Sequence, residues 1–393
     1  MATYKEQNKL NVPHLRFPEF HGEWEKCKLG DIAEFSTARV SSVKLDCKNY
    51  VSTENMLQDF QGVVEAKSVP NETNVISFTC GDILISNIRP YLKKVWKATF
   101  DGGCSSDVFV LQATDTVAKD YLHYAVANDK FINYVMSGAK GVKMPRGDKN
   151  QMRTYQLSLP SIQEQYKIAK LLTLLDERIA TQSKLIEDLK KLKSAIIDYA
   201  INSLDTDFAK FGSLYEMAGE GGTPTTSNAS FYDNGKIPFI KIDDLKKKYL
   251  TENKDFITEL GLQKSSAWLV PSRSILFSNG ATIGEITITT YPVCTKQGIL
   301  GIVPKPNIDV EFLYYFMSSS YFKKAVSRIV TEGTMKTAYL KDINNIRCPI
   351  PIKEKQQDIA KMPSALNSKI DFEQSILKRF CSQKQYLLRQ MFM

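Results

Sequence analysis

Two stretches of the chain carry apolar residues at the alternating three- and four-residue spacing of an amphipathic helix. The first stretch follows Pro160, and its apolar positions are Ile168, Leu172, Leu175, Ile179, Ile186, Leu189 and Ile196. The second follows Pro351, and its apolar positions are Ile359, Leu366, Ile370, Leu377, Phe380 and Leu387. This heptad-like seam predicts two long helices. We place them in residues 157–204 and 349–393.

The second stretch is a degraded copy of the first. The sequence SIQEQYKIAKLLTLLDERI (161–179) returns as IKEKQQDIAKMPSALNSKI (352–370). Helices with matching seams are expected to pack against each other, and the short connections along the chain predict an antiparallel pair. Pro363 interrupts the second seam, and we expect a local break in the helix there, because proline removes a helical hydrogen bond.

The remaining residues form two globular segments, 1–156 and 205–348, which also echo each other. GDILISN (81–87) parallels RSILFSNG (273–280), so each segment has an apolar run that ends in Ser-Asn. Short β-rich runs mixed with a few helices are typical of an α+β domain. We therefore predict two similar α+β domains at opposite ends of the antiparallel helix pair, related by a pseudo-two-fold internal repeat.

Composition narrows the class of protein. A chain of 393 residues, with 43% hydrophobic and 24% charged residues, is too long for one ordinary core. We expect a cytoplasmic protein without a membrane span, because no apolar run approaches roughly 18 residues and the N-terminus lacks a signal peptide's apolar core. Seven cysteines without a C-x-x-C pair predict reduced thiols and no zinc site. The net charge of +9 permits nucleic-acid binding without establishing it.

Basic and amide side chains gather in two loops of the first globular segment. Arginine and asparagine can pair with the edges of guanine and adenine, and lysine neutralises phosphate. The candidate DNA contacts in SNIRPYLKK and AKGVKMPRGDK are Asn87, Arg89, Tyr91, Lys93, Lys94, Lys140, Lys143 and Arg146. The alternative is that both are solvated surface loops.

The second globular segment offers polar residues near the ends of its expected strands. The candidates are Thr223, Thr225, Ser278, Asn279, Thr282, Lys296, Gln297, Thr334 and Lys336. Glutamine and asparagine suit adenine, but either is often a satisfied loop amide. The different side chains at corresponding places are consistent with two domains that read different sequences, and equally with drift.

Several of these stretches resemble the specificity subunit of type I restriction-modification systems. They are VPHLRFPEFHGEWEKCKLGDIAEF (12–35), GDILISNIRPYLKK, CSSDVFVL, GVKMPRGDKNQM, GGTPTTSNASFYDNGKIPFIKIDDL (221–245) and the duplicated helix. The resemblance implies a non-catalytic subunit that reads a bipartite site in double-stranded DNA, one half-site per globular domain. It also implies two modification (methyltransferase) subunits and two ATP-dependent restriction subunits as partners, which would carry the S-adenosylmethionine, ATP and Mg; no cofactor is expected in this chain.

Two alternatives stay open on the sequence. A coiled-coil scaffold with two protein-binding globular domains would explain the helical repeat equally well, and salt-insensitive binding to a protein would favour it. A nuclease fused to a DNA reader would cleave DNA with a metal ion. The sequence offers little for that chemistry, because the three histidines lack metal-ligand spacing and no G-x-x-x-x-G-K-[ST] loop is present. We expect no catalytic and no metal-binding residues.

Overall fold

The computed structural model describes residues 11–280, 282–330 and 336–392. The chain divides into two compact units, and two long helices contribute to both. Unit 1 comprises residues 1–183 and 376–393, and unit 2 comprises residues 184–375.

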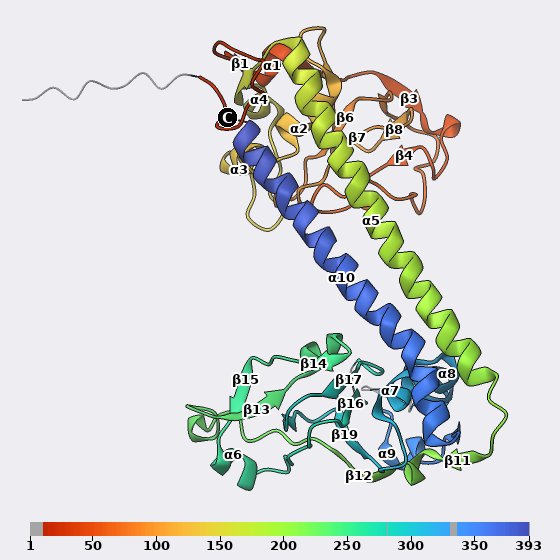
Figure 1. The fold of residues 1–393 in the computed structure, drawn as a ribbon. Coiled ribbons are helices and arrows are strands. Elements are labelled where there is room, and N and C mark those ends of the chain that lie inside the picture. Colours follow the sequence, from red (N-terminus) through yellow and green to blue (C-terminus); the bar gives the residue numbers. More distant parts are fainter. Residues whose placement is uncertain (1–10, 281, 331–335, 393) are drawn as a thin grey trace, which may run out of the picture. The chain divides into compact units, whose positions relative to one another are not determined.

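Unit 1 combines short strands with four short α-helices in the part of it that the structure describes (Figure 1). Its elements before the first long helix are β1 (Glu25–Lys28), α1 (Leu29–Ile32), β2 (Ala33–Phe35), β3 (Arg39–Ser41), β4 (Tyr50–Val51), β5 (Asn74–Phe78), β6 (Ile83–Ser86), β7 (Val95–Lys97), β8 (Gly102–Cys104), β9 (Val108–Ala113), α2 (Lys119–Val126), α3 (Asp129–Ser137), α4 (Lys149–Arg153) and β10 (Gln156–Leu159). The strands form sheets in the orders β2-β9-β6-β7 and β3-β5-β8-β4, and β1 pairs with β10.

Unit 2 repeats this plan. Its elements between the long helices are β11 (Phe208–Lys210), β12 (Tyr215–Glu220), β13 (Ile237–Ile240), β14 (Tyr249–Leu250), β15 (Asp255–Ile257), α6 (Glu259–Gln263), β16 (Ile275–Ser278), β17 (Ile286–Thr289), β18 (Cys294–Thr295), β19 (Ile299–Pro304), α7 (Val310–Ser318), α8 (Ser320–Ile329), α9 (Leu340–Ile343) and β20 (Arg347–Pro349). The sheet orders are β12-β19-β16-β17-β14 and β15-β13-β18, and β11 pairs with β20.

The internal repeat is visible in the strand pairing. In unit 1, β6 lies between β9 and β7 and is antiparallel to both; in unit 2, β16 lies between β19 and β17 in the same way. Both central strands are buried along their whole length. Their sequences, ILIS and ILFS, are nearly continuous apolar runs, because a strand covered on both faces has no solvent-facing side. The predicted α+β class and the internal repeat are confirmed.

The two long helices are α5 (Ile162–Asn202) and α10 (Lys353–Met391). In unit 1, Asp176 of α5 forms an ion pair with Lys384 of α10 (2.6 Å), and the Arg178 guanidinium lies over the Phe380 ring. In unit 2, Lys193 Nζ donates to Asn367 Oδ1 (2.9 Å). Facing residue numbers rise along α5 and fall along α10, so the predicted antiparallel pair is confirmed.

Every seam residue is buried or half-buried, as the heptad pattern predicts. The seam also packs on the globular parts of the units. Ile168, Leu172 and Leu175 belong to the core cluster of unit 1 together with α2 and α3 residues, and Ile359 packs against the core of unit 2. The helices are therefore held by the units as well as by each other. Among the described residues, no helix is long and apolar enough to cross a membrane.

The expected break at Pro363 is wrong, because α10 is helical throughout and contains Pro363. Tertiary contacts hold the helix on both sides of the proline. Ala360 lies in the core of unit 2, and Ser364 Oγ meets Tyr315 Oη (3.1 Å) and Lys248 Nζ (2.9 Å). These contacts outweigh the roughly 3 kcal/mol that an interior proline costs an isolated helix.

Candidate nucleic-acid interface

In unit 1, the end of strand β6 brings the two predicted DNA-contact loops together. The carbonyl oxygen of Asn87, the residue after β6, accepts from the Gly147 amide (2.8 Å), and the Arg89 amide donates to the Pro145 carbonyl (2.8 Å). The bridge between Ile88 and Arg146 adds a third connection. The loops SNIRPYLKK and AKGVKMPRGDK, distant in sequence, therefore form one surface.

The first loop has an unusual backbone. Arg89 and Lys93, on either side of the short 3₁₀-helix Pro90–Leu92, both have a left-handed conformation, with φ of 50° and 54°. That region is uncommon for residues other than glycine. In this turn the Arg89 side chain is exposed and the Tyr91 side chain is about half exposed. Such strain is often found at binding sites.

Ion pairs divide the basic residues of this surface into two groups. Lys93 pairs with Asp129, Lys140 with Asp148 and Arg146 with Asp107, at 2.8, 3.4 and 3.1 Å respectively. Within the described part of the chain, Arg89 and Lys143 have no ion-pair partner, and both are exposed. Their charges are the most available to an incoming phosphate or base edge.

Lys94 is held by the protein itself. Its Nζ donates to the Thr53 carbonyl (2.5 Å), and burial, followed by the nearby Arg89 charge, lowers the pKa of the ammonium. Its predicted role as a DNA contact stays a prediction, but its geometry serves the shape of the loop.

Unit 2 gathers its polar residues around the equivalent strand end. The Asn279 carbonyl, after β16, accepts from the Ala338 amide (2.9 Å), and the Asn279 amide donates to the Gly298 carbonyl (3.0 Å). In unit 1 the Asn87 amide donates to the Asp107 carbonyl (2.9 Å) in the same manner. The duplicated Ser-Asn thus ties one strand end to two further segments in each unit.

The side chains of the Ser-Asn pair lie beneath the surface. Asn87, Ser278 and Asn279 are 8%, 0% and 2% exposed, and Ser278 Oγ accepts from the Glu285 amide (2.8 Å). Neither asparagine Oδ1 has a hydrogen-bond partner among the described residues. Their main-chain bonds organise the site, and base contact by these three side chains stays a prediction that their burial does not favour.

Four other candidates of unit 2 lie along one edge, and three of them are exposed. Thr223 Oγ1 accepts from the Gln297 amide (3.4 Å), and Lys296 precedes Gln297 on the same loop. Lys296, Gln297 and Thr225 are exposed. Thr282, also exposed, follows the strand end, and Thr334 lies outside the described residues. The geometry therefore joins the GGTPTT segment to the loop after β18.

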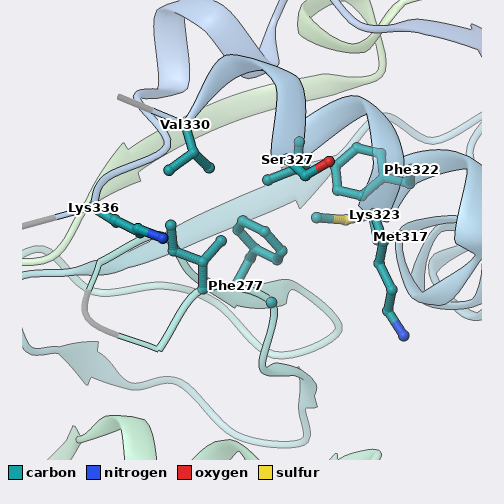
Figure 2. Close-up of a pocket in the computed structure, with 10 residues that line it drawn as sticks. Phe277, Met317, Phe322, Lys323, Ser327, Val330 and Lys336 are labelled. Carbon is teal, nitrogen blue, oxygen red and sulfur yellow. The ribbon is translucent and has the colours of Figure 1, made fainter. Parts of the chain in front are cut away.

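Lys336 lines an apolar pocket of about 420 Å³ to which α8 contributes most and β16 contributes Phe277 (Figure 2). Phe277 and Phe322 are among its walls, and the Lys336 side chain reaches toward Phe277 in the view. The lysine stem can cover apolar surface while its ammonium stays in water. The candidates of unit 2 are mostly hydroxyl and amide side chains, so they carry less positive charge than the candidates of unit 1.

The family model for the type I restriction modification DNA specificity domain matches the chain twice, over residues 21–191 and 205–379. Each match contains one globular domain and most of the long helix that follows it. The chain belongs to this family. It is a specificity subunit with two target-recognition domains, and the scaffold alternative is not favoured.

Named relatives are specificity subunits too, and one of them matches over most of the length. The type I restriction enzyme MjaVIII specificity subunit of Methanocaldococcus jannaschii is 24% identical over 95% of this chain and 92% of its own. The MjaIX specificity subunit of the same organism is 32% identical over 42% of this chain and 39% of its own.

Solved structures share the fold. The S subunit of a type I restriction-modification system from M. genitalium has a TM-score of 0.59 and 16% identity, covering 97% of this chain and 99% of its own. A chain from a study of complex assembly in a type I R-M system also has a TM-score of 0.59, with 17% identity, covering 93% of this chain and 96% of its own.

Sequence reasoning missed residues that support the candidate surfaces without being among the predicted contacts. Asp107 orients Arg146 through its carboxylate, and Glu220 accepts from the Gly298 amide (2.8 Å). Gln165 and Gln356 join the long helices to the recognition domains. A signal for the glutamines was present, because each stands five residues after the proline that precedes its helix. Among the described residues, no cluster of His, Cys, Asp or Glu could hold a metal ion.

Proposed function

We propose that this specificity subunit reads a bipartite DNA site, with one half-site for each recognition domain and an unread spacer between them. The main support is the strand end that recurs in both units, after β6 and after β16, because different side chains surround it in each unit. Unit 1 presents Arg89 and Lys143, whereas unit 2 presents Thr225, Lys296 and Gln297. One scaffold with two sets of side chains supports two different half-sites.

The remaining parts of the complex supply the chemistry in this proposal. DNA and the methyltransferase and restriction subunits are the partners that the family implies; we propose two copies of each subunit, with the modification subunits held on the long helices. S-adenosylmethionine, ATP and Mg would be bound by those partners in the cytoplasm. The chain itself would recognise DNA without a catalytic residue of its own.

A genome-wide map of methylated adenines tests the proposal. Cells that express this chain with its modification subunit are compared with cells that lack only this chain. We expect methylation confined to one motif of two short, different half-sites with a spacer of fixed length. A continuous motif, or an unchanged map while the two proteins still associate, contradicts the proposal.

A further inference from the structure

In unit 1, a buried glutamine fastens the start of α5 to the recognition domain. Gln165 is 1% exposed, and its Oε1 accepts from the amide of Ala118, the residue that caps α2 (2.9 Å). Its Nε2 donates to the Pro160 carbonyl (3.0 Å). One side chain therefore joins the long helix, its own entry segment and a helix of the globular domain.

A second attachment lies about two turns further along α5. The hydroxyl of Tyr124, on α2, meets Thr173 Oγ1 (3.3 Å) and donates to Asp176 Oδ2 (2.9 Å). Two turns of helix span roughly 11 Å. Two attachments at that separation fix both the position and the direction of a helix, which a single attachment cannot do.

Unit 2 has the same two attachments at the same spacing. Gln356, also 1% exposed, accepts from the amide of Asp309, which caps α7, and donates to the Pro351 carbonyl, both at 2.8 Å. The Tyr315 hydroxyl meets Ser364 Oγ on α10 (3.1 Å). Both pairs of partners lie 191 positions after their counterparts in unit 1.

The same attachments recur in both units although some of the residues that make them differ. Thr173 has become Ser364, and the capping Ala118 has become Asp309, yet the hydrogen bonds are retained. Breaking one leaves a buried polar group unpaired, which costs more than the bond gains when made. A two-point fastening that recurs in both units is therefore suited to a task common to both.

We infer that Gln165, Tyr124, Gln356 and Tyr315 are positioning residues that fix the direction of each long helix relative to its recognition domain, and thereby the length of spacer that the subunit accepts. This inference rests on the proposed bipartite recognition. The four residues touch no DNA in this scheme. They act through the helices, because a change in the angle of either helix alters where its recognition domain meets the duplex.

The test compares methylation of duplexes that carry both half-sites with the cognate spacer, or with one base pair added or removed. Tyr124→Phe and Tyr315→Phe each delete one hydroxyl and leave the ring. Gln165→Leu is a stronger change. We expect the ratio of non-cognate to cognate spacer methylation to rise about tenfold, as for the loss of one buried hydrogen bond, while the preferred bases of both half-sites stay the same.

Tyr134→Phe is a matched control. Tyr134 Oη meets Thr154 Oγ1 (2.8 Å), so this variant also deletes a tyrosine–threonine hydrogen bond in unit 1, but one that does not reach a long helix. A purely structural role would lower methylation at every spacer alike and leave the ratio unchanged. The inference is overturned by an unchanged ratio in the two tyrosine variants, or by an equal rise in the control.

The outcomes also separate this inference from the proposed function. If the unaltered subunit methylates no bipartite motif, the proposed function fails. If it methylates one with a fixed spacer and the tyrosine variants keep that spacer as strictly, only the positioning inference fails. The tyrosine variants decide the matter even if thermal melting shows that Gln165→Leu does not fold.

Discussion

At the scale of single residues, the two units differ at a histidine whose ring nitrogen is buried. His123 of α2 and Tyr314 of α7 occupy corresponding places in the repeated sequences YLHY and FLYY. The Nδ1 of His123 is buried without a hydrogen-bond partner among the described residues. Burial, followed by the charges of Lys384 and Lys97, lowers the pKa of His123 from 6.5 to about 4.

This depressed pKa predicts a loss of stability in acid. Between about pH 6.5 and pH 4 the unfolded chain binds a proton at His123 that the folded chain does not, so the free energy of unfolding falls as the pH falls through that window. Above about pH 6.5 the residue contributes no pH dependence. We expect His123→Tyr, which copies Tyr314, to reduce the acid-linked loss by roughly 1–2 kcal/mol.

Urea unfolding of the chain and the variant at several pH values measures this difference. The two stability curves should run parallel above about pH 6.5 and diverge below it. Parallel curves down to pH 4 would contradict the depressed pKa of His123 in the folded protein.

At the scale of elements, Pro363 is the position where local preference and tertiary packing disagree. Alanine there would restore an amide that can donate to the Ile359 carbonyl, four residues earlier in α10. Lost contacts of the buried ring and a less restricted unfolded chain offset part of the gain. We expect Pro363→Ala to raise the free energy of unfolding by roughly 1 kcal/mol, or about 2–4 °C in melting temperature.

The reciprocal substitution is Leu172→Pro, at the corresponding place in α5. Leu172 is fully buried, and a proline there should cost more than about 3 kcal/mol because both a helical bond and core packing are lost. Thermal melting of both variants gives the comparison. A fall in stability for Pro363→Ala would mean that the proline ring contributes more to the core of unit 2 than its missing amide costs.

The long helices were the most predictable elements of the fold. Pro363 shows the limit of that prediction, because the continuity of α10 through the proline could not be read from the sequence. A seam of thirteen apolar positions repeats so regularly that the helices, their pairing and their direction follow from the sequence. The continuity of α10 depends on Ser364, Tyr315 and Lys248, which come together only in the fold. The same limit applies to the site, since the pairing of Asn87 with Gly147 has no trace in local sequence.

At the scale of the whole molecule, the two units have separate hydrophobic cores. Residues of α5 before position 184 pack in the core of unit 1, whereas Ile197 and Ile201 pack in the core of unit 2. Each recognition surface is also built entirely from residues of its own unit. Among the described residues, each surface is therefore backed by the core of its own unit.

This separation predicts that base preferences can be altered one half-site at a time. Arg89→Ala removes an exposed guanidinium from the surface of unit 1, and a lost base contact of that type typically costs 1–3 kcal/mol of discrimination. We expect the base preference to weaken roughly tenfold at one position of the first half-site and to stay unchanged at the second half-site.

Gln297→Ala should have the reciprocal effect. Motif analysis of methylated genomes from the two variants therefore forms a crossed comparison. A change in the second half-site caused by Arg89→Ala would contradict independent reading by the two domains, because Arg89 belongs to the surface of unit 1 alone.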